Sequence, residues 1–292
     1  MIARIKYSVL RIYAYLFGSS ATNRLLWLYK QVYTYTKSLI HPYRYDEKRY
    51  KDTFLSKTAD VLDDKIVLPV PRIIYIFWTG DNEMSENRKR CVESIISTAG
   101  VQVKLITSEN LNEYILEEHP LHPAYEYLSF VHRSDYLRCY FMNYYGGGYV
   151  DIKKLRKSWK RAFDKLNNSQ AYLIGYPESN IDGSAWYSEN DINLKSDLYL
   201  YWRLLLGNGG YICRPHTKFT IEWMTEINSR LDKYLPLLEK YPSNNDPYMN
   251  AGTNYPIQWT EICGSIFHPL CLKYNKKILS DKTLRPIIKD YR

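Results

Sequence analysis

The stretch that decides the fold of this chain is HRSDYLRCYFMNYYGGGYVDIK, residues 132–153. An apolar and aromatic pattern predicts a helix over residues 130–145 that ends at three consecutive glycines. Glycine permits a sharp reversal of the chain, and the residues that follow predict a short strand over 149–152. We therefore expect this strand to return alongside the helix.

Three charged side chains of this stretch are expected to converge. Asp135 and Arg138 are three residues apart, so they share one face of the predicted helix, and the reversal brings Asp151 back beside them. Carboxylates suit ribose or sugar hydroxyls and a guanidinium suits phosphate, so the set indicates a nucleotide diphosphate site. A surface ion pair and a simple helix cap are the alternative interpretations of the same residues.

Upstream of this stretch, the pattern is that of an α/β protein. The continuous apolar run Ile73–Trp78 predicts a buried strand. Further elements are expected as a helix over 84–98, a strand over 101–106 and a short helix over 109–118. This alternation predicts a mostly parallel sheet flanked by helices, in which ligands lie at the carboxyl ends of the strands. Trp78 and Asp151 both fall at such ends.

Two segments resemble a known family. Residues 71–80 (PRIIYIFWTG) and residues 133–151, with their Arg-Ser-Asp-Tyr-Leu-Arg and Tyr-Gly-Gly-Gly-Tyr-Val-Asp motifs, resemble the DXD-containing glycosyltransferases of family 32 and related bacterial capsule and O-antigen sugar transferases. The resemblance implies a GT-A nucleotide-diphospho-sugar transferase fold, which we expect over residues 65–292. It also implies a UDP- or GDP-hexose donor and retention of anomeric configuration.

The same resemblance assigns roles to individual residues. Trp78 matches the aromatic residue that contacts the base, Asp135 the carboxylate that approaches ribose or sugar, and Arg138 the arginine that faces donor sugar and phosphate. Asp151 matches the first aspartate of the DXD motif. We therefore expect these four residues to bind the donor, with Arg138 and Asp151 also taking part in catalysis.

Lys153 stands where the family has its second DXD carboxylate. An ammonium group cannot ligate a hard cation such as Mn²⁺ or Mg²⁺, which requires oxygen ligands. Lys153 could itself neutralise the diphosphate in a metal-independent reaction, or Asp151 could hold the metal with Glu261 or His268. A third alternative is a catalytically silent nucleotide-sugar-binding homologue.

Two segments near these residues carry weaker signals. The basic stretch after Lys153 has Leu155, Trp159 and Phe163 at every fourth position, which predicts an amphipathic helix. The glycine-rich segment 207–210 predicts a loop or hairpin that enters a strand and lines the sugar site. No nucleic-acid-binding motif accompanies the basic stretch, so nucleic acid is not an expected partner.

Positive charge is concentrated at the N-terminus. The formal net charge is +9, and residues 1–51 hold ten Lys and Arg against Asp46 and Glu47. No apolar stretch there approaches the about 20 residues that span a bilayer. With nine tyrosines, the segment predicts a pair of interfacial helices on an anionic cytoplasmic leaflet, joined to the body by a linker over 42–51. Two ordinary helices packed on the body, or a membrane-bound scaffold, are the alternatives.

The five cysteines are widely spaced, without the short spacing of a zinc or redox site, and predict reduced, buried thiols. Together these features predict a cytoplasmic enzyme, peripheral on the inner face of the cell membrane. It would transfer a hexose to a lipid-linked or growing bacterial surface polysaccharide, either O-antigen or capsule.

Overall fold

The computed structural model describes residues 2–57, 68–184, 191–244 and 253–291. Its centre is a six-stranded sheet in the order β2-β1-β3-β5-β4-β6, in which only β5 runs antiparallel to its neighbours. The strands are β1 Ile73–Trp78, β2 Gln102–Thr107, β3 Gly147–Val150, β4 Leu173–Pro177, β5 Leu206–Cys213 and β6 Ile278–Ser280. The predicted mostly parallel sheet is therefore confirmed.

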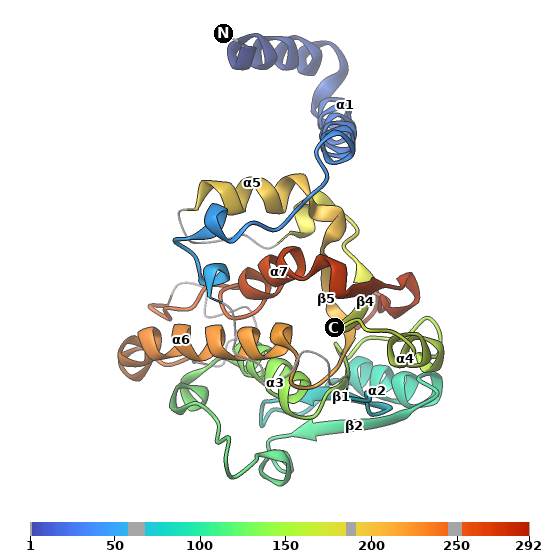
Figure 1. Ribbon diagram of the computed structural model, residues 1–292, viewed down its shortest axis with the longest axis vertical. Coiled ribbons are helices and arrows are strands. Elements are labelled where there is room, and N and C mark those ends of the chain that lie inside the picture. Colours follow the sequence, from blue (N-terminus) through green and yellow to red (C-terminus); the bar gives the residue numbers. More distant parts are fainter. Residues whose placement is uncertain (1, 58–67, 185–190, 245–252, 292) are drawn as a thin grey trace.

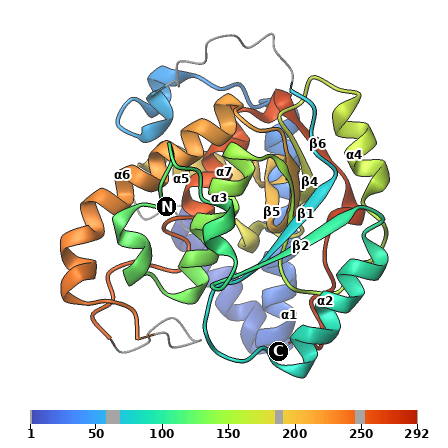
Figure 2. The same cartoon turned by 90° about the horizontal axis from the view of Figure 1, so that it is seen from below.

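Helices cover both faces of this sheet (Figures 1 and 2). One face carries α2 Glu86–Thr98 and α4 Lys160–Asn167, and the other carries α3 Phe130–Tyr144, α6 Lys218–Lys240 and α7 Gly264–Lys273. Strand β1 shows how the two cores are filled, because alternate side chains of a strand point to opposite faces. Ile74 and Ile76 join the core under α2 and α4, whereas Tyr75 and Phe77 join the larger core under α3.

Strand β1 and helix α3 lie where the sequence predicts them. The reversal after α3 depends on Gly146 and Gly147, which have φ angles of 65° and 99°, a region that side chains disfavour. The amide of Gly146 donates to the carbonyl of Phe141 at 2.9 Å, which closes the helix. The chain then enters β3 at once, so Asp151 directly follows the strand.

Other predicted elements differ from the structure. Residues 109–118 do not form the predicted short helix: only Leu111–Tyr114 is helical, as a single 3₁₀ turn. The chain beyond it is bonded to Tyr140 instead, whose hydroxyl accepts from the amide of Leu116 and donates to the carbonyl of His119. The basic helix begins at Lys160 rather than Lys153, because the amide of Trp159 is bonded to the carbonyl of Ala99. The glycine-rich segment 207–210 lies inside β5 rather than in a loop.

The N-terminal segment forms one helix, α1 Ile2–Ile40, rather than the predicted pair. It projects from the body and rests near α5 Ile192–Leu200 (Figure 1). The contact includes hydrogen bonds, in which Arg203 donates to the hydroxyl of Thr34 at 2.9 Å and to the side chain of Gln31 at 2.9 Å. Among the described residues, no helix has the length and apolar character needed to cross a membrane.

The segment after α1 packs on the body as well. The guanidinium of Arg49 makes a two-pronged ion pair with Asp197 of α5, at 2.6 and 3.0 Å, and the buried hydroxyl of Tyr50 donates to the same carboxylate at 2.6 Å. This stretch, which the sequence suggests is a linker, is thus fixed by a nearly buried charge pair. All five cysteines are buried free thiols, as predicted.

Burial of His132 generates a prediction about acid stability. Its Nε2 donates to the carbonyl of Gln258 at 3.2 Å, so its Nδ1 accepts from the hydroxyl of Tyr255 at 2.8 Å. Burial lowers the pKa of His132 from 6.5 to about 4. A histidine whose pKa is lowered by folding stabilises the native state at pH values above the pKa that it has in the unfolded chain. This contribution to the free energy of unfolding is lost as pH falls from 6.5 towards 4.

Between pH 8 and pH 5, the free energy of unfolding of the wild type should therefore fall by about 2 kcal/mol because of His132. The His132→Gln variant lacks the imidazole and should not show this fall. Urea unfolding at both pH values should show the stability gap between the two proteins narrowing by that amount. His41→Gln, at an exposed position, is the control. The prediction is contradicted if the difference in unfolding free energy between wild type and His132→Gln stays constant or widens towards pH 5.

Candidate active site

A cavity of about 450 Å³ opens at the carboxyl ends of β1 and β3. Five residues singled out from the sequence line it: Trp78, Asp135, Arg138, Asp151 and Lys153. Other lining residues come from distant parts of the chain: Thr79, Arg88, Tyr149, Asn208, Gly209, Trp259, Cys263 and Tyr291. The cavity therefore gathers side chains from the sheet edge, α3, β5 and the C-terminal segment.

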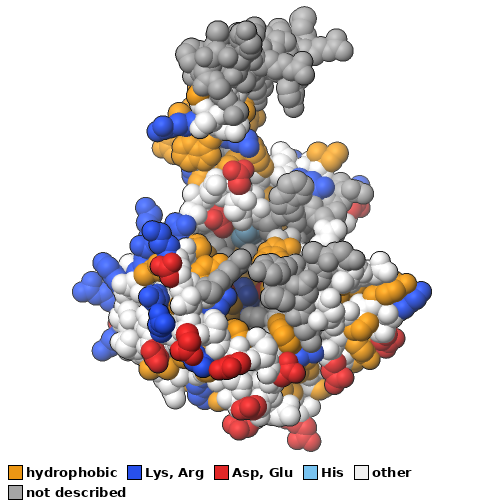
Figure 3. All heavy atoms as spheres, turned by 180° about the vertical axis from the view of Figure 1, so that it is seen from behind, with side chains coloured by type: hydrophobic (Ala, Val, Ile, Leu, Met, Phe, Trp, Pro, Cys, Tyr) orange, Lys and Arg blue, Asp and Glu red, His pale blue; other side chains and the backbone are white. Residues whose placement is uncertain are grey.

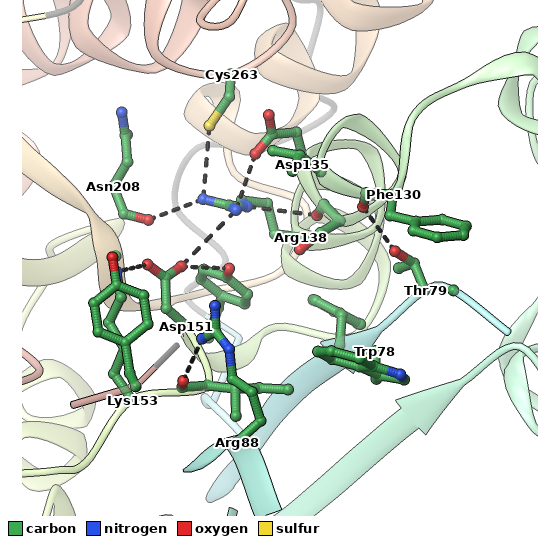
Figure 4. A pocket seen from close by; sticks show the side chains of 18 of the residues that line it. Trp78, Thr79, Arg88, Phe130, Asp135, Arg138, Asp151, Lys153, Asn208 and Cys263 are labelled. Atoms are coloured by element: carbon green, nitrogen blue, oxygen red, sulfur yellow. Dashed lines mark hydrogen bonds and ion pairs between the residues drawn. The ribbon is translucent and has the colours of Figure 1, made fainter. Parts of the chain in front are cut away.

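The guanidinium of Arg138 is the centre of this cavity (Figure 4). It is nearly buried and pairs with Asp135 at 2.9 Å, donates to the carbonyl of Asn208 at 3.0 Å, and lies 4.4 Å from the ring centre of Tyr149. Burial raises the pKa of Asp135 to about 6, although Arg138 opposes the rise. Burial thus opposes the charged form of Asp135, and the ion pair with Arg138 favours it.

Both oxygens of Asp151 are occupied by hydrogen bonds. The hydroxyl of Tyr149 donates to one oxygen at 2.7 Å and the ammonium of Lys153 donates to the other at 2.7 Å. Burial alone would raise the pKa of Asp151, but Lys153 and Arg138 hold it below its usual range. Asp151 is therefore an anion between two cations.

The aromatic residue at the end of β1 forms one side of the cavity. The indole N–H of Trp78 donates to the carbonyl of Asn82 at 2.9 Å, which fixes the ring at the rim. The hydroxyl of Thr79 donates to the carbonyl of Phe130 at 2.7 Å and ties the end of β1 to the start of α3. A planar ligand can stack on such a ring.

Sequence patterns gave no signal for Arg88 and Tyr291 as site residues. Arg88 donates to the carbonyl of Ile152 at 2.6 Å, and its guanidinium lies 4.8 Å from the ring centre of Tyr291. The ammonium of Lys153 lies 4.8 Å from the centre of the same ring. Both cations thus contact one ring, through contacts between residues far apart in the sequence.

Glu261 and His268 do not line this cavity, although the sequence suggests either as a metal ligand beside Asp151. The buried guanidinium of Arg230 donates to the carboxylate and backbone carbonyl of Glu261, at 3.4 and 2.8 Å. The imidazole of His268 donates to the carbonyl of Leu206 at 3.0 Å. In the part of the chain that the structure describes, no three His, Cys, Asp or Glu residues form a group fit to hold a metal.

A family model described as capsular polysaccharide synthesis protein matches residues 28–199. The chain belongs to this family. The matched residues include Trp78, Asp135, Arg138, Asp151 and Lys153, so the cavity lies largely within the matched region.

No curated protein matches the chain. Among solved structures, it is similar to the apo structure of the WbbM bifunctional glycosyltransferase, with 11% identity and a TM-score of 0.41. The match covers 74% of this chain and 40% of that one, so the chain spans less than half the length of that protein.

Removal of the central guanidinium should destabilise the fold. Arg138→Met removes the buried cation that Asp135 and Asp151 share. The free energy of unfolding should fall by about 3–5 kcal/mol. Urea unfolding at pH 7.5 measures the loss. Arg161→Met, at an exposed position on α4, should change stability by less than about 0.5 kcal/mol. A loss below about 1 kcal/mol for Arg138→Met would show that the network is not a structural centre.

Proposed function

We propose that this protein is a glycosyltransferase that moves a hexose from a nucleotide-diphosphate donor to a growing capsular polysaccharide. The observation that carries this proposal is the candidate active site, where an aromatic rim, three cations and two carboxylates converge at the carboxyl edge of the sheet. Membership of the capsular polysaccharide synthesis family supports the polymer class.

In the proposed complex, the base stacks on Trp78 and the diphosphate lies towards Lys153 and Arg88. Asp135 and Asp151 accept hydrogen bonds from ribose or sugar hydroxyls. Transfer breaks the bond between the sugar C1 and the diphosphate and forms a bond from C1 to an acceptor oxygen. In the retaining reaction that the family 32 resemblance implies, the acceptor proton passes to the leaving phosphate.

Lys153 has the central electrostatic role in this proposal. Negative charge develops on the leaving diphosphate, and a cation fixed beside it lowers the barrier. The ammonium of Lys153 is held by Asp151 and by the face of Tyr291, so it is in place before the donor binds. A Mn²⁺ or Mg²⁺ ion would supply the same charge, but the ammonium of Lys153 lies against Asp151, where a second oxygen ligand would be needed, so we derive no step through a metal.

Donor turnover tests this proposal. Purified protein should hydrolyse at least one member of a panel of UDP- and GDP-hexoses, and should do so in excess EDTA. Lys153→Gln should lower kcat/KM by about 10²–10³-fold, because one charge that stabilises the leaving group is lost. Lys157→Gln, at an exposed position of the same segment, is the control. Loss of turnover in EDTA would overturn the metal-independent role, and donor binding without turnover would favour a silent homologue.

We further propose that the described part of α1 binds an anionic membrane surface. Thr34 is buried against the body, where its hydroxyl accepts from the indole of Trp202, whereas many apolar and aromatic side chains of the helix are exposed (Figure 3). These exposed side chains, with exposed fractions of 40–69%, are Leu25, Trp27, Leu28, Tyr29, Val32, Tyr33, Tyr35, Leu39 and Ile40. This arrangement is the reverse of a helix packed on a core. The exposed Arg24 and Lys37 favour acidic headgroups.

The membrane proposal predicts that vesicle binding depends on this face. The full chain should sediment with vesicles containing phosphatidylglycerol, and more weakly with neutral vesicles. Leu28→Ser/Val32→Ser/Leu39→Ser, on one exposed face of the helix, should reduce binding more than about tenfold, because each buried CH₂ group contributes about 0.8 kcal/mol. Ile96→Ser, which removes an exposed apolar residue of α2, is the control. If the protein is a dimer in solution and does not bind vesicles, the exposed face of α1 is instead an interface with a second copy of the chain.

A further inference from the structure

A second cavity, of about 520 Å³, opens at the same edge of the sheet as the candidate active site. It is lined by Tyr176 and Pro177 at the end of β4, by Arg156, and by Lys282 and Arg285, which follow β6. Because β1, β3, β4 and β6 all run in one direction, their carboxyl ends share one edge. The first cavity follows β1 and β3, and the second follows β4 and β6.

The second cavity carries three cations and one carboxylate. Arg156, Lys282 and Arg285 have no side-chain hydrogen bond or ion pair with any residue in the described ranges. The carboxylate is Glu178, which accepts from the amide of Ser179 at 2.7 Å. The lining is therefore positive overall, and its guanidinium and ammonium donors are available to an anion. Figure 3 shows Lys and Arg side chains gathered on one side of the molecule.

The side chain of Tyr176 connects the linings of the two cavities. The hydroxyl of Tyr176, which lines the second cavity, accepts from the amide of Gly209 at 3.2 Å. Gly209 lines the candidate active site, and a Cβ built on it would lie 3.2 Å from an oxygen of Asp151 and 3.1 Å from the hydroxyl of Tyr176. A molecule in the second cavity would thus be next to the place where the donor sugar is proposed to react.

We propose that the second cavity binds a phosphate or diphosphate group carried by the acceptor. This inference rests on the proposed function, because it assigns the acceptor side of the same reaction. Two guanidinium groups present paired donors that match phosphate oxygens, and Lys282 adds a third positive charge. The phosphate could belong to a lipid diphosphate or to a phosphorylated sugar, and both present the same oxyanion.

Calorimetric titration with inorganic pyrophosphate tests this assignment without requiring turnover. The full chain should bind pyrophosphate at two sites, the candidate active site and the second cavity. Arg156→Gln/Lys282→Gln/Arg285→Gln should weaken binding at the second cavity more than about tenfold, because charge-assisted hydrogen bonds to the phosphate oxygens are lost. Lys153→Gln should weaken binding at the other site. Lys157→Gln/Lys160→Gln/Arg161→Gln, which removes the same charge from exposed positions nearby, is the matched control.

Equal pyrophosphate binding by the cavity variant and its control would overturn the inference. The single variants Arg156→Gln and Lys282→Gln, both at exposed positions, give the same test if the triple variant does not fold. Intact binding at the second cavity without donor turnover would instead reject the proposed function alone. Farnesyl diphosphate and glucose 6-phosphate, titrated in parallel, distinguish a lipid diphosphate from a phosphorylated sugar.

Discussion

The buried guanidinium of Arg138 joins three segments that are distant in the sequence. It pairs with Asp135 on its own helix, donates to the backbone of Asn208 at the start of β5, and lies over the ring of Tyr149 from β3. A charge withdrawn from water requires such partners, because an uncompensated buried ion costs several kcal/mol. The positions of α3, β3 and β5 are therefore coupled at the point where the cavity opens.

Local patterns were sufficient to predict the parts of the fold that depend on local chemistry. The run Ile73–Trp78 is apolar throughout because both faces of β1 are covered, and the glycines after α3 are needed for positive φ. Asp197 illustrates what lies beyond such patterns. The sequence marks it only as one more acidic residue, yet it is buried and paired with Arg49, 148 positions away.

The candidate site shows the same division. Asp135, Arg138, Asp151 and Lys153 belong to one continuous stretch, so spacing alone could bring them together. Glu261 was suggested as a metal ligand because segment 259–269 resembles a late stretch of the family, but its partner Arg230 lies on α6, far from it in the sequence, and could not be predicted from the residues around Glu261. The second cavity draws on residues from 156 to 285, and no local motif connects them.

The segment between Asp151 and α4 is irregular, although the sequence predicts that the helix begins there. Lys153 and Arg156 are three residues apart, so a helix through both would place them on the same face. The chain is irregular until Trp159 binds the carbonyl of Ala99, and the two cations line different cavities. In the proposed reaction, donor and acceptor each carry an anionic group, and their mutual repulsion is reduced when each has its own cations. The irregular backbone thus supplies what a regular helix could not, namely two separate positive sites from one short basic segment.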